Sequence, residues 1–328
     1  MRKPLGMILR LSAVFLCLFL SNLPNGFSQS IIINEVAPTN NTFLDEDEET
    51  KDWIELYNES TEIVNLENWT ITDDKTKPQK WVFPAIDIAP KDFFTFFASG
   101  KDRNTLLTYR TILQEGDACK YLIPNATTPS NWRTIDFDDT NWNGGKTGVG
   151  YGDGDDNTVV PYRTRSVFVR QTFTVTDLSK IEEIIFHADY DDGFAAYING
   201  IEIARGNITG GAFPPYSAGV INDREAELYK GIVPPKFTLK NVMELLVEGE
   251  NVLAVQVHNV NTNSSDLTII PFLSFGTKTP LTIGSEVPHF LNLRPSFLHT
   301  NFKISNEETL YLFNAEKELQ DSLFIPIL

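Results

Sequence analysis

The sequence predicts an all-β protein of two domains. Its 328 residues are about twice the usual length of one domain. Hydrophobic residues make up 41% of the chain and aromatic residues 12%, far more than a disordered chain carries. Short alternating or β-branched runs recur between clusters of Asn, Asp, Gly and Pro, and helix-like periodicity is scarce. This spacing is typical of β-sandwiches.

Residues 1–28 have the pattern of a secretory signal peptide. Three basic residues precede an apolar run over 11–20, and small or polar residues follow up to Ser28. The run is too short for a spanning helix of ~20 residues, although an N-terminal membrane anchor stays open as the alternative. We therefore expect an exported chain, secreted or at the cell surface, with no transmembrane span in its mature form.

The acidic charge excludes some partners. Cleavage of the signal would remove three of 27 basic residues and none of 44 acidic ones, so the net charge would deepen from −17 to −20. Nucleic acids and anionic membranes need Lys/Arg clusters, so neither is expected as a partner. With two Cys and four His there is little material for zinc sites or disulfides, and Cys119 would be a single spectator thiol.

Strand patterns account for most of the chain before residue 105. Five strands are expected, at Ile31–Val36, Trp53–Tyr57, Trp69–Thr72, Lys80–Phe83 and Phe93–Ala98. In the last of these both faces are apolar. One face should therefore pack in the core, and the other under a loop or a neighbouring domain; a single generous core is the alternative.

The remaining elements are also mostly strands. The pair Asn199–Gly200 accepts the positive φ angles of a two-residue turn, so residues 195–203 should form a hairpin. A short helix is expected at Leu239–Val247, where apolar residues share one face. Further strands are expected at Val167–Val175, Ile181–Ala188, Asn251–His258, Ile269–Phe275, Leu310–Phe313 and Leu319–Ile325.

Several motifs in the first hundred residues resemble the lamin-tail domain in its secreted bacterial form. These are IIINEVAPTN (31–40), DEDEET (45–50), DWIELYNES (52–60), VNLENWTITDD (64–74) and KWVFPAIDIAPKDFFTFFASGKDR (80–103). The resemblance implies an immunoglobulin-like β-sandwich of ~100 residues. The family pattern continues with segments similar to HTNFKIS and ETLYLF, which stand here only at 299–305 and 308–313.

That gap suggests one domain interrupted by another. We expect residues 31–103 to form the first part of the lamin-tail domain and 297–328 its last part, truncated at Leu328, with 104–296 as an insertion. A sandwich loop accepts an insertion whose ends lie close together. The rival interpretation is a complete first domain and an incomplete second copy. Strand pairing distinguishes them, because insertion requires Leu310–Phe313 to pair with a strand from 31–103.

The inserted segment has its own resemblance, to a galactose-binding-like jelly roll. The motifs are NWRTIDFDDTNWNGGKTGVGYGDGDDNT (131–158), VFVRQTFTV (167–175), DYDDGFAAYINGIEIARGN (189–207) and LLVEGENVLAVQVHN (245–259). Such modules accompany exported carbohydrate-active and adhesion proteins, so the resemblance implies a related role without naming a ligand. The expected class is therefore all-β, an immunoglobulin-like sandwich interrupted by a jelly-roll sandwich.

Aromatic and polar residues of the insertion are candidates for carbohydrate binding. Aromatic faces pack against sugar C–H surfaces, while amides and carboxylates bind hydroxyl groups. Core packing is the alternative for the tryptophans. The candidates are Trp132, Trp142, Tyr151, Tyr190, Asp192, Asn199 and Asn259.

Acidic turns in the insertion are candidates for a structural Ca²⁺ site. Calcium takes several carboxylate and carbonyl oxygens from turn-rich segments. A solvated acidic turn and side-chain turn bonds are the alternatives. The candidates are Asp153, Asp155, Asp156, Asp189 and Asp191. The run 45–49 is expected to be a solvated loop, with weak divalent-cation binding as its alternative.

No intrinsic catalysis is expected. The sequence has no Gly-x-Ser-x-Gly elbow and no His-Glu-x-x-His helix. The resemblance implies a frequent pairing with CotH-type kinase domains, yet kinase signatures are missing from these residues. We therefore expect an exported binding or adhesion protein whose partner is a glycan or a cell-surface or extracellular protein. The alternatives are a spacer or targeting region for a downstream kinase or hydrolase domain, and calcium-dependent protein docking.

Overall fold

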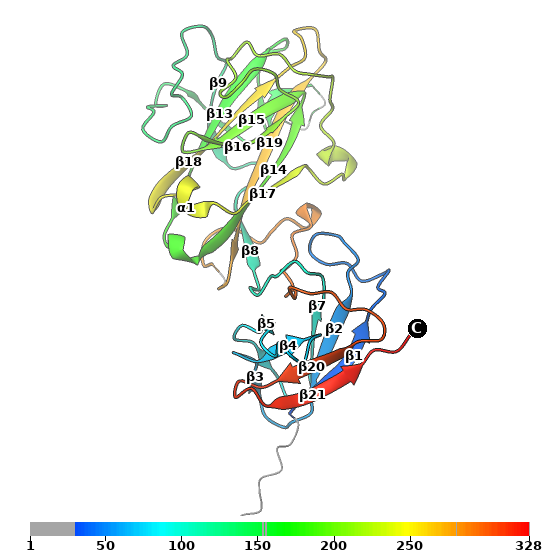
Figure 1. Cartoon of the computed structure of the whole chain (residues 1–328). Coiled ribbons are helices and arrows are strands. Elements are labelled where there is room, and N and C mark those ends of the chain that lie inside the picture. Colours follow the sequence, from blue (N-terminus) through cyan, green and yellow to red (C-terminus); the bar gives the residue numbers. More distant parts are fainter. Residues whose placement is uncertain (1–29, 153, 155, 280, 328) are drawn as a thin grey trace, which may run out of the picture.

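The computed structural model describes residues 30–152, 154, 156–279 and 281–327, and the signal-like segment 1–28 lies outside them. The described residues form two stacked β units joined by a pair of adjacent chain crossings (Figure 1). The expected all-β class is confirmed, since in the described part of the chain helices are limited to α1 (Val242–Leu245) and three short 3₁₀ turns. Within the described ranges no helix has the length and hydrophobicity needed to cross a bilayer.

The first sandwich combines both ends of the described chain. It contains β1 (Ile31–Ala37), β2 (Trp53–Asn58), β3 (Val64–Asn65), β4 (Thr70–Thr72), β5 (Trp81–Val82), β6 (Asp87–Ile88), β7 (Phe93–Phe97), β20 (Thr309–Phe313) and β21 (Leu319–Phe324). One sheet has the order β1-β2-β7 and the facing sheet the order β21-β20-β4-β5. The register Tyr311↔Thr72 joins the last part of the chain to the first.

This pairing is what an interrupted sandwich requires. The chain leaves the first sandwich after β7 and returns before β20, and His299 lies beside both Phe97 and Arg103 in β-bridges. The crossing segments are therefore neighbours, so a long insertion leaves the sandwich framework intact. The apolar core between the two sheets includes Phe96 and Leu312, each fully buried.

Strand β7 uses both of its faces, as the sequence indicated. Phe96 packs in the core between the sheets. Phe97 points the other way, stacks on Phe43 and His299, and meets Phe297 edge to face, with ring centroids 5.1–5.2 Å apart. A cover formed by the loop before β2 and by the returning chain thus explains the uninterrupted apolar run.

The second sandwich is larger and is formed by the insertion. Its strands are β8 (Thr108–Leu113), β9 (Ala118–Leu122), β10 (Asn143–Lys146), β11 (Val149–Tyr151), β12 (Thr158–Val159), β13 (Ser166–Val175), β14 (Ile181–Asp191), β15 (Gly193–Ile198), β16 (Ile201–Gly206), β17 (Lys236–Leu239), β18 (Gly249–His258) and β19 (Leu267–Thr277). The helical turns are η1 (Leu178–Lys180), η2 (Leu228–Lys230), α1 (Val242–Leu245) and η3 (His289–Leu291).

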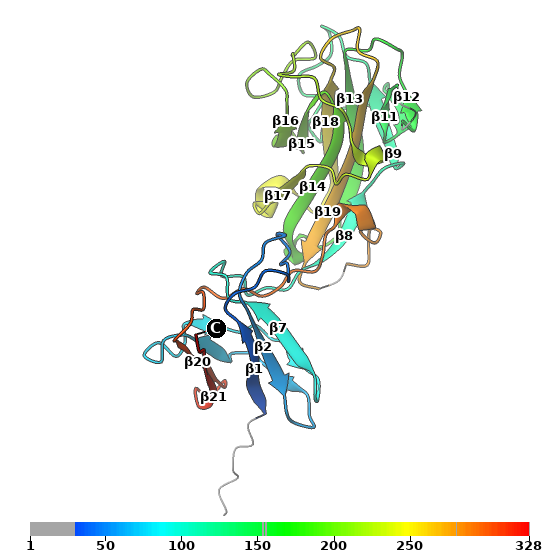
Figure 2. The same cartoon turned by 90° about the vertical axis from the view of Figure 1, so that its right-hand side faces the viewer.

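Two six-stranded sheets face each other in this unit. Their orders are β10-β9-β13-β18-β15-β16 and β12-β11-β19-β14-β17, with β8 also on β19. Strands β14 and β19 run along the long axis of the unit (Figure 2). Residue Ile181 begins β14 opposite Thr277, near the first sandwich, and Asp191 ends it opposite Thr268, at the far end. Eleven residues at ~3.3 Å each separate the two ends by roughly 35 Å.

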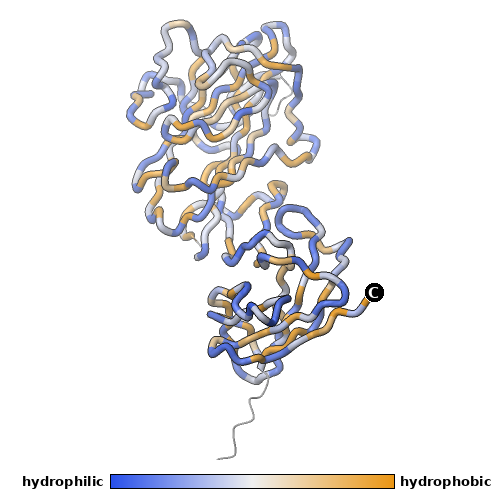
Figure 3. Tube along the Cα trace, in the orientation of Figure 1, coloured by the Kyte–Doolittle hydropathy of each residue, from blue (hydrophilic) through white to orange (hydrophobic). Residues whose placement is uncertain are grey.

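The local predictions hold with one adjustment. The hairpin β15–β16 is confirmed, and Asn199 and Gly200 have φ values of 52° and 92°. The helix is shorter than expected, covering Val242–Leu245 alone, because Leu239 pairs with Ile184 as the end of β17. Hydrophobic residues are concentrated inside both units and hydrophilic ones along the loops (Figure 3).

Candidate functional site

The acidic loop between β1 and β2 is neutralised by cations from the chain crossing. Lys101 Nζ lies 2.5 Å from Asp45 Oδ2, 2.6 Å from Asp47 Oδ2 and 2.8 Å from Glu49 Oε2. Asp45 Oδ1 also accepts the main-chain N–H groups of Asp47 and Glu49, both at 2.9 Å. The expectation of a solvated loop is therefore wrong at Asp45, which is 1% exposed because it holds the loop closed around Lys101.

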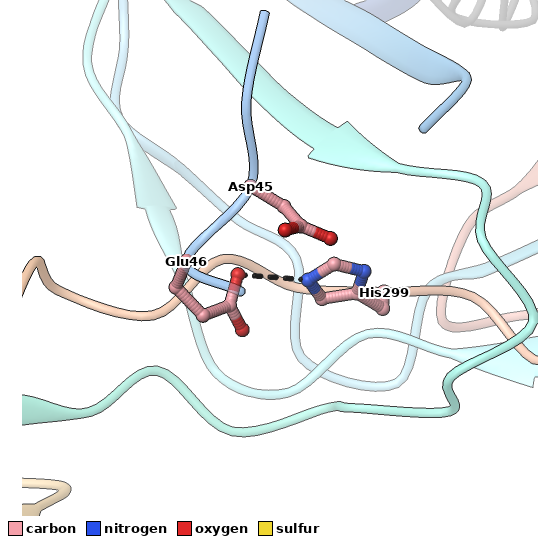
Figure 4. A group of neighbouring side chains, drawn as sticks. All are labelled: Asp45, Glu46 and His299. Atoms are coloured by element: carbon pink, nitrogen blue, oxygen red, sulfur yellow. Dashed lines mark hydrogen bonds and ion pairs between the residues drawn. The ribbon is translucent and has the colours of Figure 1, made fainter. Parts of the chain in front are cut away.

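Glu46 joins this loop to the second crossing. His299 Nε2 lies 2.9 Å from Glu46 Oε2, and His299 Nδ1 lies 2.8 Å from Ser99 Oγ. The imidazole lies between the returning chain and the acidic loop (Figure 4). Serine, histidine and glutamate are also the residue types of a nucleophilic relay. Here the imidazole is fully buried, and Ser99 Oγ accepts the N–H of Lys101 at 3.1 Å, so the network connects the two crossing segments and the acidic loop.

Two carboxyl groups of the loop stay ionised at neutral pH. Burial alone would raise the pKa of Glu46, but hydrogen bonds from His299, the main chain and Arg103 outweigh it and hold the pKa at about 2. Burial likewise raises the pKa of Asp47, and hydrogen bonds from Lys101 and Arg103 lower it to about 2. A carboxyl with this pKa holds no proton at neutral pH, so it cannot act as a general acid.

A cleft of about 380 Å³ lies between the two sandwiches. One wall is formed by the acidic loop and the crossing segments 102–109 and 292–296, and the other by β14 and β17. Leu107 and Ile185 are buried apolar residues of its lining, and charged or amide groups stand around them. A volume of this size, with a few polar groups over an apolar floor, suits a small molecule or a few sugar units.

The charges in the cleft are unequally paired. Glu183 accepts hydrogen bonds from Tyr109 Oη at 2.7 Å and from Lys240 Nζ at 2.5 Å. Lys236 and Arg294 both line the cleft, and within the described part of the chain neither forms an ion pair; Arg294 Nε donates only to Asn292 Oδ1, at 3.2 Å. Two positive groups of an acidic chain therefore remain available to a ligand.

A second acidic cluster lies at the far end of the second sandwich. Asp191, Glu225 and Asp266 each place one carboxylate oxygen within 4.8 Å of the other two. Asp191 is 3% exposed, and its Oδ1 has no hydrogen-bond partner among the described residues. Burial, followed by the charges of Asp192, Asp266, Glu225 and Asp223, raises the pKa of Asp191 to about 8. Among the described residues neither Asp191 nor Asp266 forms an ion pair, in contrast to Asp45 and Asp47 beside Lys101 in the first sandwich.

The tryptophans expected to bind sugar are core residues. Trp132 and Trp142 are 4% and 8% exposed, and Trp132 stacks on Phe168 with centroids 4.1 Å apart. They belong to a small core between the outer face of β13, β15 and β18 and the covering loops, which also contains Tyr197 and Ile208. The expectation of a solvent-facing platform is corrected here, because both indole faces are covered.

The remaining sugar-binding candidates are divided between opposite ends of the second sandwich. Asp192 precedes β15 and Asn199 follows it, so the whole strand separates them. Asn199 Nδ2 donates to the carbonyl of Leu245 at 2.9 Å and to Asn251 Oδ1 at 2.7 Å. Asn199 therefore fixes the turn against α1 and β18, and the expectation of one shared site with Asp192 is corrected.

At the far end the candidates are engaged with one another and with the main chain. Asn259 Nδ2 donates to Tyr151 Oη and to the carbonyl of Asp266, each at 2.9 Å. Tyr190 is 6% exposed, and the Arg224 guanidinium lies 3.8 Å from its ring centroid. These residues organise the loops of this end and present no open aromatic face.

The expected calcium ligands fall into three groups. Asp153 and Asp155 lie outside the described residues. Asp156 Oδ1 accepts a hydrogen bond from Thr268 Oγ1 at 2.7 Å, and Asp189 accepts the main-chain N–H groups of Glu227 and Leu228 at 2.7–3.0 Å. The structure therefore corrects the prediction for Asp189, whose two oxygens fix the start of η2. Asp191 alone belongs to the compact cluster.

Sequence reasoning missed the residues that matter most at both sites. Glu225 and Asp266 come from loops far from Asp191 in sequence, and Lys236 and Arg294 from segments without a motif. The Ser-Ser-Asp sequence before the predicted strand at 269–275 is the available signal for Asp266. The pairing of Asp191 with Thr268 brings that loop to the end of β14.

Comparisons with known proteins agree with the first resemblance. Residues 27–160 match the model of the Lamin Tail Domain family. The match runs past β7 into the second sandwich as far as β12, and it does not include β20 and β21. No curated protein matches the chain.

Several solved structures with weak similarity to this chain are glycoside hydrolases. Bacteroides uniformis β-glucuronidase 2 is 10% identical with a TM-score of 0.34, over 66% of this chain and 32% of that one. A glycosyl hydrolase family 2 member from Bacteroides cellulosilyticus is 14% identical with a TM-score of 0.33, over 51% of this chain and 20% of that one. Ruminococcus gnavus β-glucuronidase is 8% identical with a TM-score of 0.31, over 67% and 44%. The chain thus spans about a third or less of the length of the first two.

Proposed function

We propose that this chain is a non-catalytic, exported binding protein that recognises an acidic carbohydrate in the cleft between its sandwiches. The observation that carries the proposal is the pair of unneutralised cations, Lys236 and Arg294, beside an apolar floor. Their position beside a cleft, and not the lack of an ion pair alone, distinguishes these two basic side chains from the others of the chain. An arginine binds a carboxylate through two parallel hydrogen bonds, and a lysine adds a point charge.

The cleft also suits a carbohydrate in its neutral groups. Thr238, Asn104 and Asn292 line it and offer hydroxyl and amide groups, while Leu107 and Ile185 provide apolar contact. Sugar rings need this combination of hydrogen-bonding edges and apolar faces. A uronic-acid polymer has the hydroxyl groups, the C–H faces and the carboxylates that match these residues.

Three of the five carboxylates that line the cleft are unsuited to acid catalysis. A glycosidase needs one carboxylic acid with a raised pKa and a second carboxylate at a defined distance. In this cleft the pKa values of Glu46 and Asp47 are lowered to about 2, and Glu183 is engaged by Tyr109 and Lys240. None of these three is placed to protonate a leaving group.

The proposal that the chain is exported rests on the signal-like segment 1–28.

Binding of polysaccharides to the full chain tests the proposal. We expect retention by immobilised polygalacturonic acid, little retention by neutral dextran, and no reducing ends released. The double variant Lys236→Gln/Arg294→Gln should bind at least tenfold more weakly, because two charged contacts are lost. Lys146→Gln, an exposed lysine on β10 outside the cleft, is the matched control and should bind like wild type.

Two results would overturn this assignment. If the double variant bound polygalacturonic acid as tightly as wild type, the binding site would not be the cleft. Failure of the wild-type chain to bind any acidic or neutral polymer would favour the alternative role, a spacer or targeting region for an enzyme domain.

A further inference from the structure

We infer that Asp191, Glu225 and Asp266 form a binding site for a hard divalent cation, Ca²⁺ in the first place, which ties three loops together at the far end of the second sandwich. The site is independent of the proposed cleft, because it lies at the opposite end of β14. Its support comes from spacing, from a buried atom without a partner, and from the convergence of three loops.

The spacing of the oxygens fits a calcium ion. Calcium binds oxygen ligands at 2.3–2.6 Å, so any two ligands of one ion lie within about 5 Å of each other. The three carboxylates each offer an oxygen within 4.8 Å of the other two. The ligand set contains no sulfur or imidazole, which favours Ca²⁺ or Mg²⁺ over transition metals.

The burial of Asp191 is the second observation. This residue is 3% exposed, and its Oδ1 has no hydrogen-bond partner among the described residues. A buried carboxylate oxygen without a partner is costly. Asp266 Oδ1 accepts weak hydrogen bonds from two hydroxyl groups, Ser265 Oγ at 3.1 Å and Ser264 Oγ at 3.4 Å, so it is only partly satisfied.

The nearest arginine does not fill the cluster. The Arg224 guanidinium donates to the main-chain carbonyls of Tyr190 and Glu225 and stacks on the Tyr190 ring. The four charges that act most strongly on Asp191 all belong to carboxylates. Among the described residues, neither Asp191 nor Asp266 forms an ion pair with a basic side chain, so a cation from solution would be the counter-charge of these two carboxylates.

The three loops already converge on the neighbouring residue. Asp192 Oδ1 accepts the N–H of Arg224 at 2.7 Å, and Asp192 Oδ2 accepts the N–H of Val260 at 2.6 Å. Asp192 thus connects the β14–β15 turn, the segment before η2 and the β18–β19 loop through main-chain contacts. A cation held by the carboxylates would link the same three segments a second time, and would stiffen the end of the sandwich.

Titration of the full chain with Ca²⁺ after EDTA treatment tests the site. Calorimetry should show one Ca²⁺ bound per chain, and the thermal unfolding midpoint should rise by several degrees, since the ion binds the folded state. Mg²⁺ should bind more weakly, because it demands a tighter octahedral shell. Asp191→Asn should abolish both the binding and the thermal shift.

Two further variants keep the result interpretable. Glu225→Gln alters an exposed ligand, so this variant should fold even if Asp191→Asn does not. Its affinity for Ca²⁺ should be at least tenfold lower than that of wild type. Glu250→Gln removes an exposed carboxylate of the same sandwich at the opposite end of β18, which is not one of the three ligands, and should bind like wild type. The site would be overturned if the wild-type chain bound neither Ca²⁺ nor Mg²⁺. It would also be overturned if both Glu225→Gln and Asp191→Asn bound Ca²⁺ as tightly as wild type.

Discussion

Both sandwiches contain a compact group of carboxylates, and the two groups are balanced in opposite ways. In the first sandwich Lys101 Nζ lies within 2.8 Å of three carboxylate oxygens of the acidic loop. In the second sandwich the charges around Asp191 are carboxylates again. The pKa values follow this difference, since Asp47 is lowered to about 2 and Asp191 is raised to about 8.

The contrast shows that acidic motifs alone do not identify a cation site. The run DEDEET is the densest acidic segment of the chain, yet the ammonium group of Lys101 already lies among its carboxylates. The cluster around Asp191 is assembled from three separate loops and contains no dense run. What separates them is whether the fold brings a basic side chain to the carboxylates, which depends on tertiary structure.

Removing the internal cation should have the largest effect. Lys101→Met keeps the length of the side chain and leaves the buried Asp45 without its partner. Loss of one member of a buried ion pair costs about 3 kcal/mol of unfolding free energy. Chemical denaturation of wild type and variant measures this. Added Ca²⁺ should restore part of the loss in the variant and none in wild type, because the vacated position is surrounded by three carboxylates.

Lys51→Met is the control for that experiment. Lys51 lies 3.5 Å from Glu49 and is more exposed, so its loss should cost less than about 0.5 kcal/mol. Equal losses in the two variants would contradict the view that Lys101 is the internal counter-ion of the loop.

Acid should weaken the first cluster within a defined pH range. The pKa of Glu46 is about 2 in the folded chain against an ordinary 4.5, so its stabilising contribution is complete above pH 4.5 and disappears as the pH falls towards 2. This difference in pKa corresponds to about 3 kcal/mol, which Glu46→Gln removes at neutral pH. Unfolding free energies of wild type and variant should therefore differ at pH 7 and converge near pH 2.

An exposed glutamate provides the comparison. Glu62→Gln in the same sandwich should leave the free energy unchanged within about 0.5 kcal/mol across this range. A constant difference between wild type and Glu46→Gln down to pH 2 would show that the ionisation of Glu46 is not what stabilises the crossing.

The fold was largely accessible from the sequence because its strands are long and strongly patterned. The Asn199–Gly200 turn and the long strands β13, β14 and β18 follow directly from turn chemistry and β-branched runs. The two-residue strands β3 and β6 and the glycine-rich β10 and β11 were not expected, because such short segments carry no periodicity. They become strands through pairing with neighbours that the local sequence does not specify.

The candidate sites were less accessible, because they depend on which loops meet. Residue types identified Trp132 and Trp142 as sugar-binding candidates, but whether an indole faces solvent is decided by the loop that covers it. Asp191 was identified by its local acidic turn. Its partners Glu225 and Asp266 are 34 and 75 residues away in the chain, so only the fold shows that they share a site.

The difference between the two carboxylate clusters can also be tested by giving the second cluster a basic side chain of its own. Glu225→Lys would place an ammonium group beside Asp191 and Asp266, in the role that Lys101 has in the first sandwich. Because residue 225 is exposed, the gain in unfolding free energy without divalent cations should be small, about 1 kcal/mol. Denaturation in EDTA measures this gain, and denaturation in Ca²⁺ should show no further stabilisation. If Glu225→Lys destabilises the EDTA-treated chain while Glu225→Gln does not, the cluster is not short of positive charge, and its difference from the acidic loop has another origin.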